Sequence, residues 1–331
     1  MIRENDIIHI LAEQSGHFVS GEDLANLLGC SRAAVWKKIQ RLREKGYPIE
    51  AVTKKGYKYL NTHEVFERRV SAFLAGQNDT FFNVKYLDRV SSTNAVCREL
   101  GREGAREGLV VAALVQEAGR GRRGNAWLSD NTDGLWFSIL VRPQTDVEYL
   151  GLLSLVMALS VHDAFDASGY TDSAIKWPND IVSLRTGRKL CGILSEASFE
   201  DQRLSFAVIG CGVNVSQKAF PESIALKATS LHVEGVLNVT KESLLGGILV
   251  AFKKRYKEFL HSPSDMLSDY RSLCVTLGRE VRVEGDAPLT GKAYDIDRLG
   301  RLIVLDANKE MHSFSAGDVS VRGIMGYTDV T

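Results

Sequence analysis

Cysteines are few in this sequence, and none stands in a metal-binding pattern. The five are scattered at Cys30, Cys97, Cys191, Cys211 and Cys274, with no Cys-x-x-Cys pair. Their spacing predicts neither a zinc site nor a disulfide framework. A reducing cytoplasm is therefore the simplest setting for the chain.

Long apolar runs and a targeting segment are also missing. The longest apolar run, around residues 150–161, is too short to span a bilayer and indicates a buried helix. The first six residues are charged at once and lack the apolar segment of a signal peptide. We therefore expect no secretion signal and no membrane partner.

Net charge is absent as well, because 41 lysines and arginines balance 41 aspartates and glutamates. This balance argues against nucleic-acid binding along the whole chain, but it leaves room for one basic domain. The hydrophobic fraction of 44% and the charged fraction of 25% are ordinary for a globular protein. A length of 331 residues predicts two or three domains.

The first sixty residues have the pattern of a helix-turn-helix followed by a wing. Apolar positions between residues 5 and 15 predict a first helix. Ser20 is placed to cap a second helix and Ser31 a third, the two being separated by a short glycine-containing turn. Residues 47–60 alternate in polarity and turn before Gly56, which is typical of a β-hairpin.

Positive charge is concentrated in that segment. Residues 31–58 hold nine basic and two acidic residues, a net charge of +7. Such a cluster favours phosphate contacts, and the first turns of the third helix would meet base edges. The predicted DNA contacts are Ser20, Ser31, Arg32, Trp36, Lys37, Lys38, Lys54 and Lys55. The alternative is a winged helix that binds protein or only separates domains.

Three glycines alternate with three arginines at residues 119–124, directly after the apolar run 109–115. Glycine lets the backbone turn sharply and approach a ligand, and arginine binds carboxylates and phosphates. The spacing also fits the dinucleotide fingerprint, but a strand-like run at 135–141 follows where that fold needs a helix. We interpret the segment as a loop around a small anion. The alternative is a solvated basic turn without function.

Four further segments carry polar residues or glycines next to short elements. Lys-Trp-Pro-Asn-Asp at residues 176–180 offers a cation for phosphate and a ring for a base, although Pro-Asn-Asp alone is a turn signal. Lys189 opens an apolar strand, where lysine is uncommon without an anionic partner. Residues 209–215 combine a strand with glycines, where a ligand or another backbone approaches closely. By itself, Ser-Thr-Asn at residues 92–94 favours a helix cap.

Short strands with few helices between them favour an α+β protein with a mixed, largely antiparallel sheet backed by helices. Residues 216–230 are polar and irregular and predict a mobile lid, and residues 241–260 predict an amphipathic helix. Short β runs follow at 280–283, 290–296, 301–305 and 310–314 and predict a small SH3-like β-barrel. This last part holds no catalytic set and suits packing, assembly or substrate docking.

Together these motifs resemble one family, the bacterial biotin–protein ligases that also repress the biotin operon. The glycine-arginine loop, the Lys-Trp-Pro-Asn-Asp segment and Lys-Leu-Cys-Gly-Ile-Leu at residues 189–194 match the family's motifs in order. Residues 20–22 and 31–34 are similar to the members that carry a DNA-binding domain. The resemblance implies a winged helix-turn-helix at 1–62, a catalytic domain with the biotin–lipoate ligase fold, like class II aminoacyl-tRNA synthetases, at 63–270, and an SH3-like barrel at 271–331.

The resemblance also implies roles for single residues, and it makes Ser92 a ligand contact rather than only a cap. Biotin would be bound by Ser92, Thr93, Asn94, Gln116, Arg120, Gly121, Arg122, Lys189, Gly192, Gly210 and Gly212. ATP and the adenylate would be bound by Arg122, Arg123, Lys176, Trp177, Asn179 and Asn214.

The chemistry that the resemblance implies begins with biotin, ATP and Mg²⁺, which yield biotinyl-5′-AMP. A lysine of the biotin carboxyl carrier protein of acetyl-CoA carboxylase then displaces AMP. Lys189 and Arg122 would offset the repulsion between carboxylate and phosphate, and Asp180 would deprotonate or orient the acceptor amine.

The adenylate would also promote a homodimer that binds operator DNA, with residues 135–141 as a candidate edge strand. The alternatives are a lipoate–protein ligase, which shares the fold, and a biotin-sensing regulator without ligase activity.

Overall fold

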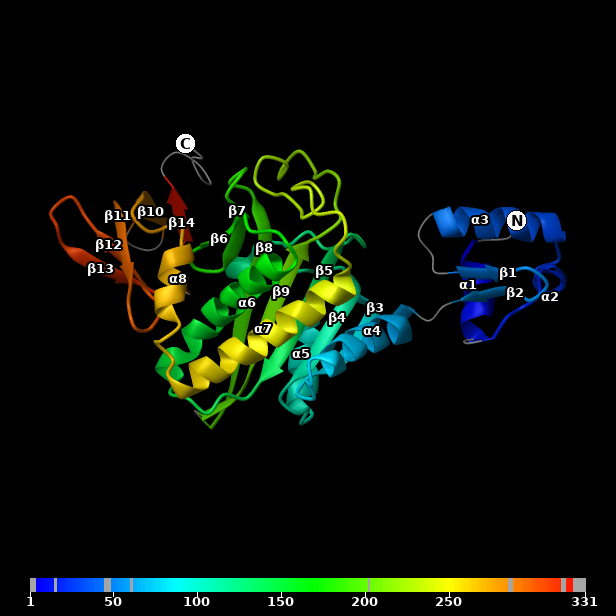
Figure 1. Ribbon diagram of the computed structural model, residues 1–331, viewed down its shortest axis with the longest axis horizontal. Coiled ribbons are helices and arrows are strands. Elements are labelled where there is room, and N and C mark those ends of the chain that lie inside the picture. Colours follow the sequence, from blue (N-terminus) through cyan, green and yellow to red (C-terminus); the bar gives the residue numbers. More distant parts are fainter. Residues whose placement is uncertain are drawn as a thin grey trace. The chain divides into compact units, whose positions relative to one another are not determined.

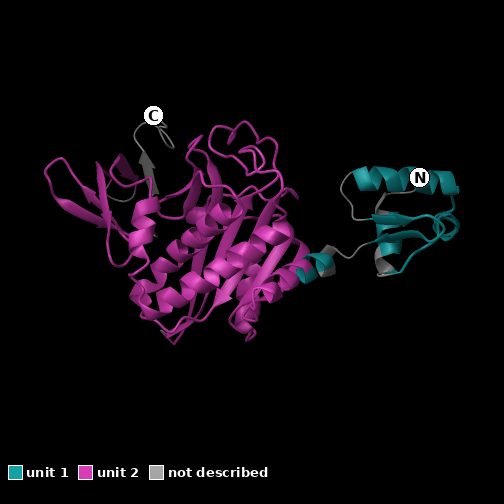
Figure 2. Cartoon of the chain, viewed as in Figure 1, with its two compact units in different colours: residues 1–68 teal, residues 69–331 magenta. Residues whose placement is uncertain are grey.

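The structure is a computed structural model that describes residues 4–14, 17–44, 49–59, 62–201, 203–284, 288–316 and 320–323. Its contacts divide the chain into two units, residues 1–68 and residues 69–331, which Figure 2 shows in different colours. The segment expected as a separate C-terminal domain belongs to the second unit.

Three helices and a hairpin form the N-terminal unit. They are α1 (Glu4–Glu13), α2 (Gly21–Leu27), α3 (Arg32–Glu44), β1 (Ile49–Val52) and β2 (Gly56–Tyr59), labelled in Figure 1. Ser20 Oγ accepts a hydrogen bond of 3.0 Å from the backbone N–H of Asp23, and Ser31 Oγ accepts one of 3.2 Å from Ala34. The core consists of buried apolar side chains, among them Ile7, Leu11, Leu24, Val35, Ile39 and Leu42. The predicted winged helix-turn-helix is therefore confirmed.

The wing is the antiparallel hairpin β1–β2, and its turn depends on glycine. Gly56 has a φ of +106°, and a Cβ at this position would lie 2.1 Å from the carbonyl oxygen of Val19. Val19 and Tyr57 exchange two backbone hydrogen bonds of 2.8 Å. The hairpin is thereby fixed to the segment that precedes α2.

A seven-stranded sheet with the order β3-β4-β5-β9-β8-β7-β6 forms the centre of the second unit. Its strands are β3 (Asn83–Val90), β4 (Leu109–Gln116), β5 (Gly134–Val141), β6 (Ser173–Lys176), β7 (Asp180–Ser183), β8 (Lys189–Glu200) and β9 (Arg203–Asn214). β3 and β4 are parallel, and the other neighbours in this sheet are antiparallel. The predicted mixed, largely antiparallel sheet is confirmed.

The prediction that residues 135–141 lie at a sheet edge is wrong. Strand β5 lies between β4 and β9, and all eight of its residues are buried. The edges of this sheet are β3 and β6. A nearly continuous apolar run is compatible with an interior strand because both of its faces are covered.

Helices cover the central sheet. They are α4 (Thr62–Gly76), α5 (Thr93–Arg102), α6 (Leu153–Ala167), preceded by a 3-10 helix η2 (Val147–Leu152), and α7 (Lys241–His261). Figure 1 shows α6 and α7 side by side across the sheet. The stretch Val147–Ala167 is long and apolar enough to cross a membrane, but 61% of its most apolar window is buried inside the protein. It is the buried helix that the sequence predicts.

Helix α8 (Leu267–Leu273) leads into a second sheet. Its antiparallel strands follow the order β13-β12-β11-β10-β14. Their bounds are β10 (Glu280–Glu284), β11 (Leu289–Ile296), β12 (Leu302–Leu305), β13 (Met311–Phe314) and β14 (Ser320–Gly323). This arrangement agrees with the predicted SH3-like barrel, and β14 is a strand that the sequence pattern did not indicate.

Trp177 joins the two sheets of the second unit. Its backbone N–H donates to Thr276 Oγ1 at 3.0 Å, and its indole Nε1–H donates to the carbonyl oxygen of Gly300 at 3.0 Å. Next to it, the N–H of Val275 donates to the carbonyl oxygen of Ile175 at 2.9 Å. These bonds explain why the C-terminal sheet does not separate from the central sheet as a unit of its own.

Candidate active site

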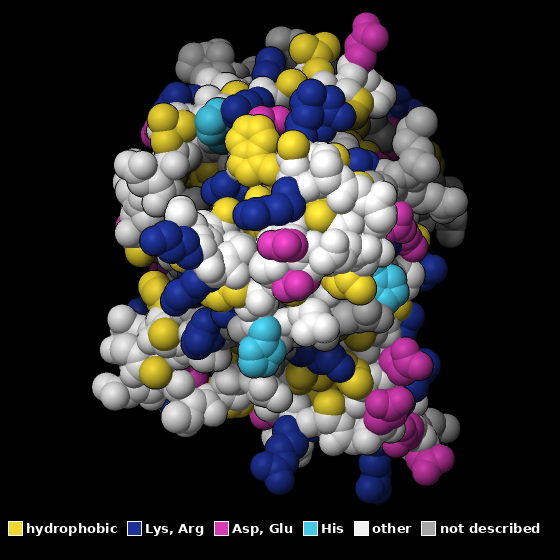
Figure 3. Space-filling model, turned by 90° about the vertical axis from the view of Figure 1, so that its right-hand side faces the viewer, with side chains coloured by type: hydrophobic (Ala, Val, Ile, Leu, Met, Phe, Trp, Pro, Cys, Tyr) yellow, Lys and Arg dark blue, Asp and Glu magenta, His cyan; other side chains and the backbone are white. Residues whose placement is uncertain are grey.

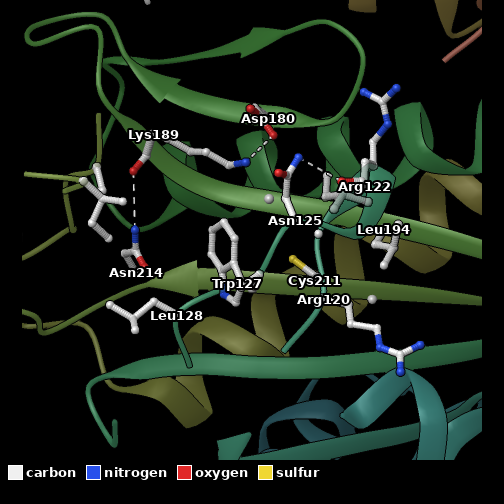
Figure 4. A pocket seen from close by; sticks show the side chains of 18 of the residues that line it. Arg120, Arg122, Asn125, Trp127, Leu128, Asp180, Lys189, Leu194, Cys211 and Asn214 are labelled. Atoms are coloured by element: carbon white, nitrogen blue, oxygen red, sulfur yellow. Dashed lines mark hydrogen bonds and ion pairs between the residues drawn. The ribbon is translucent and has the colours of Figure 1, made fainter. Parts of the chain in front are cut away.

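A cavity of about 710 Å³ is lined by β8, β9, the loop after β4 and the turn between β6 and β7 (Figure 4). The lining contains every residue for which the sequence predicts contact with biotin or ATP: Ser92, Thr93, Asn94, Gln116, Arg120, Gly121, Arg122, Arg123, Lys176, Trp177, Asn179, Lys189, Gly192, Gly210, Gly212 and Asn214, together with Asp180. The structure thus brings segments that are distant in sequence to one cavity.

One part of the cavity wall is a network of neutral polar groups. The backbone N–H and the hydroxyl of Thr93 donate to Gln116 Oε1 at 2.8 and 3.1 Å. The hydroxyl of Ser138 lies 2.6 Å from Asn94 Oδ1 and 2.8 Å from Thr93 Oγ1. Asn94 Nδ2 in turn donates to Glu196 Oε2 at 2.7 Å. These side chains are therefore held in place by one another and by the partly exposed Glu196.

Ser92 and Ser138 differ from the expectations for this wall. Ser92 is the N-cap residue that directly precedes α5, as predicted, but its hydroxyl makes no capping hydrogen bond. Ser138 was not predicted to matter, although it is a single hydroxyl in the apolar run of β5. A buried hydroxyl needs a hydrogen-bond partner, and this was the sequence signal for its role.

The floor of the cavity depends on glycines in β8 and β9. A Cβ at Gly210 would lie 2.1 Å from Asn94 Oδ1, and one at Gly212 would lie 2.5 Å from Trp127 Nε1. At Gly192 it would meet the ring of Trp127 at 2.9 Å. The close approach that these glycines predicted is therefore made by side chains of this chain, which need bare backbone beneath them.

Two tryptophans line the cavity in different ways. Trp177 is 1% exposed and its indole N–H is bonded to Gly300, so its ring does not offer a free face for a base. Trp127 lies in the middle of the cavity instead, and the ammonium of Lys189 is 5.0 Å from its ring centroid. Trp127 Nε1 is buried and has no hydrogen-bond partner among the described residues. Both tryptophans line the cavity, so the nucleotide contact at Trp177 stays a prediction and Trp127 is an aromatic residue that the sequence reasoning did not single out.

Lys189 has the anionic partner that its position predicted. Its Nζ lies 2.6 Å from Asp180 Oδ1, and the two side chains are 22% and 15% exposed (Figure 4). The backbone of Lys189 is held as well, because its N–H donates to Lys227 at 2.8 Å and its carbonyl accepts from Thr229 at 3.0 Å. Asp180 therefore orients a partly buried ammonium group toward the cavity.

The glycine-arginine loop is tightly turned, with the short 3-10 helix η1 (Arg122–Gly124) at its tip. Arg123 and Gly124 have φ angles of +55° and +74°. The guanidinium of Arg122 donates to Asn179 Oδ1 at 3.2 Å, and burial lowers the pKa of Arg122 while Asp180 raises it in part. Arg120 is exposed, and its guanidinium points away from the Lys189–Asp180 pair in Figure 4.

The segment expected as a lid closes another side of the cavity. Gln217, Phe220, Ile224 and Lys227 are among its lining residues. Its far end is anchored by Asn214, whose Nδ2 donates to the carbonyl of Thr229 at 3.0 Å. Glu234, which is 2% exposed, accepts a hydrogen bond of 2.7 Å from the hydroxyl of Thr229.

The predicted DNA-binding residues divide into two groups. Ser20 and Ser31 use their hydroxyls to cap helices, so a role in DNA contact is secondary to this structural one. Arg32, Trp36, Lys37, Lys54 and Lys55 are exposed, and Lys38 is half-buried. Helix α3 and the wing thus present positive charge. Figure 3 shows one face of the molecule, where lysine and arginine side chains lie among acidic and apolar ones.

Three family models match the sequence. They are an HTH domain over residues 3–58, the biotin/lipoate A/B protein ligase family over residues 86–214, and the biotin protein ligase C terminal domain over residues 276–322.

Known proteins match nearly the whole chain. It is 32% identical to the bifunctional ligase/repressor BirA of Bacillus subtilis over 320 residues, or 96% of this chain and 98% of that protein. It is 30% identical to BirA of Escherichia coli over 319 residues, 96% of each protein. The solved structure of the biotin protein ligase from Aquifex aeolicus in complex with biotin and ATP matches with a TM-score of 0.64 and 29% identity, over 73% of this chain and 99% of that one.

Proposed function

Because the chain belongs to the family of bifunctional biotin ligase/repressors, we propose that it activates biotin with ATP and transfers it to a lysine of the biotin carboxyl carrier protein of acetyl-CoA carboxylase. In its second function the adenylate-loaded chain represses transcription of the biotin operon. The observation that carries the enzymatic part is the ion pair of Lys189 and Asp180 in a cavity that also holds a neutral polar wall.

The cavity matches the chemistry of biotin from end to end. The neutral ureido ring of biotin needs donors and acceptors without charge, which Ser92, Thr93, Asn94 and Gln116 provide. Its carboxylate suits Lys189 and Arg122. We propose that the ring of Trp127, which lines the cavity together with Trp177, packs against the adenine.

Adenylation brings two anions together. The carboxylate oxygen of biotin attacks the α-phosphorus of ATP, the bond from that phosphorus to the bridging oxygen breaks, and pyrophosphate leaves. Lys189 and Arg122 offset the repulsion and stabilise the charge on the transferring phosphoryl group. Arg123, Lys176, Asn179 and Asn214 bind the nucleotide.

Magnesium fits this site in one respect. The described lining includes the carboxylates of Asp130 and Asp133, and oxygen atoms are the ligands that Mg²⁺ prefers. When bound, the ion neutralises phosphate oxygens. Most of its ligands would come from ATP and water.

In the second step the lysine nitrogen of the carrier protein attacks the acyl carbon, and the bond from that carbon to AMP breaks. Asp180 would deprotonate or orient that amine. Its carboxylate, 2.6 Å from the Lys189 ammonium group, also positions Lys189. The closed glycine-arginine loop keeps water from the mixed anhydride.

Repression requires that the loaded chain bind two DNA half-sites, which a homodimer of helix-turn-helix units does best. We infer that the adenylate orders the glycine-arginine loop and so favours the dimer. The interior position of β5, and the hydrogen bond between Ile175 of β6 and Val275, leave β3 as the edge strand of this sheet that such an interface can extend.

One assay separates this proposal from its alternatives. The protein is mixed with ATP and either biotin or lipoate, and pyrophosphate release and the mass of the acyl-adenylate are measured. Biotin-dependent release is expected. Release with lipoate alone supports a lipoate ligase, and biotin binding without release supports a regulator that lacks ligase activity.

Analytical ultracentrifugation tests the coupling to assembly. The sedimentation coefficient is expected to shift toward that of a dimer when biotin and ATP are both present. A sedimentation coefficient that is the same with and without biotin and ATP would contradict the proposed dimerisation.

A further inference from the structure

Trp36 is a large exposed aromatic residue of the N-terminal unit, and phosphate binding by the nearby lysines and arginines does not account for its exposure. It is 56% exposed, whereas its helix neighbours Val35 and Ile39 are fully buried. An indole is large, and keeping half of it in water forgoes the favourable burial of apolar surface. An exposed ring on an otherwise polar helix face indicates a contact with another molecule.

The position of Trp36 indicates what that partner is. It is the fifth residue of α3, which begins at Arg32, and the N-terminal turns of the second helix in a helix-turn-helix are those that meet base edges. Arg32 and Lys37 are exposed beside it, and the wing adds exposed Lys54 and Lys55. The helix that carries the ring, and the wing of the same unit, thus offer exposed cations that suit phosphates.

We propose that the indole of Trp36 reads thymine in the major groove of the operator by packing against the C5-methyl group. The methyl is the one apolar group that a base pair presents in that groove, and lysine and arginine cannot recognise it. The cations around Trp36 position the helix on the backbone, and Trp36 supplies sequence preference. This inference rests on the proposed function as a DNA-binding repressor.

The test uses the full-length chain with biotin and ATP and a random library of duplex DNA, from which a preferred sequence is enriched. Each thymine of that sequence is then replaced by deoxyuridine, which removes only the methyl group. One thymine in each half-site is expected to be sensitive to this replacement. Replacing it in a single half-site should lower the affinity of the wild-type chain about fourfold, the factor that corresponds to one buried carbon group at ~0.8 kcal/mol.

The variant Trp36→Ala lacks the ring in both half-sites of the dimer and is expected to bind the enriched sequence about 100-fold more weakly, as for the loss of two base contacts at about tenfold each. It should show no further loss on the deoxyuridine substitution, because the ring that senses the methyl is gone. The slope of affinity against salt should remain, since no charge is removed.

Two variants in the same unit serve as controls. Lys37→Ala removes a charge and should lower the salt slope by about one while leaving the deoxyuridine effect in place. Leu27→Ala shortens an apolar side chain that is 67% exposed at the end of α2 and should change neither affinity nor slope. Circular dichroism spectra matched to wild type show that each variant is folded.

Retained affinity and an unchanged deoxyuridine effect in Trp36→Ala would overturn the inference. So would a Trp36→Ala variant that alters sedimentation of the loaded chain but not DNA binding, because the ring would then face protein. If the loaded wild-type chain enriches no sequence, the proposed repression itself fails, and the inference fails with it.

Discussion

Replacing Lys189 with alanine should abolish adenylation far more than folding. The ammonium group stands 2.6 Å from Asp180 Oδ1, and the two side chains are 22% and 15% exposed. Loss of one partner from such a partly buried pair costs about 1–3 kcal/mol of unfolding free energy. Loss of a charged donor at the reacting phosphorus lowers the rate about 10²- to 10³-fold, which is roughly 3–4 kcal/mol of barrier.

Single-turnover pyrophosphate release measures the rate, and thermal unfolding measures the stability. The matched variant Lys189→Ala/Asp180→Asn removes both charges, so the stability should recover relative to Lys189→Ala. The adenylation rate should stay low because the cation is still missing. Recovery of the rate in the double variant would refute the argument, since Lys189 would then be a structural partner of Asp180 only.

Three other substitutions test the remaining parts of the site. Arg122→Gly should let the adenylate escape and label lysines of a bystander protein; an unchanged adenylate dissociation rate would contradict this role. Gly210→Ala would place a Cβ 2.1 Å from Asn94 Oδ1 and should weaken biotin binding about tenfold. An unchanged biotin Kd, measured by calorimetry, would show instead that Asn94 can move to accommodate the added methyl group. Trp177→Phe loses the hydrogen bond to Gly300 and should lower the unfolding free energy by about 1–2 kcal/mol in urea titration, and equal stability would argue against an anchor.

The parts of the fold that the sequence predicts correctly are those that depend on local residue patterns. Caps, turn glycines and alternating polarity mark the helix-turn-helix, its wing and the C-terminal strands, because each depends on residues close in sequence. The order of the central sheet is not local. An apolar run such as residues 135–141 suits an interior strand as well as an edge strand that pairs with another chain, and only the tertiary pairing places it between β4 and β9.

The same division holds for the site. Loop 119–124, Lys189 and the Lys-Trp-Pro-Asn-Asp turn are recognisable because their residue types suit anions, and they do line one cavity. The two tryptophans could not be distinguished in this way. Trp177 is buried against the C-terminal sheet and Trp127 lies over the glycine floor, and each placement depends on partners distant in the chain.

Native mass spectrometry tests the central claim most directly, because it reads the ligand and the assembly state together. The full-length chain is incubated with biotin, ATP and Mg²⁺, freed of excess nucleotide, and weighed. The account predicts a chain that carries the mass of biotinyl-5′-AMP and a dimer that increases with it. A chain that carries biotin and ATP as separate, unreacted ligands, or neither of them, would contradict the account.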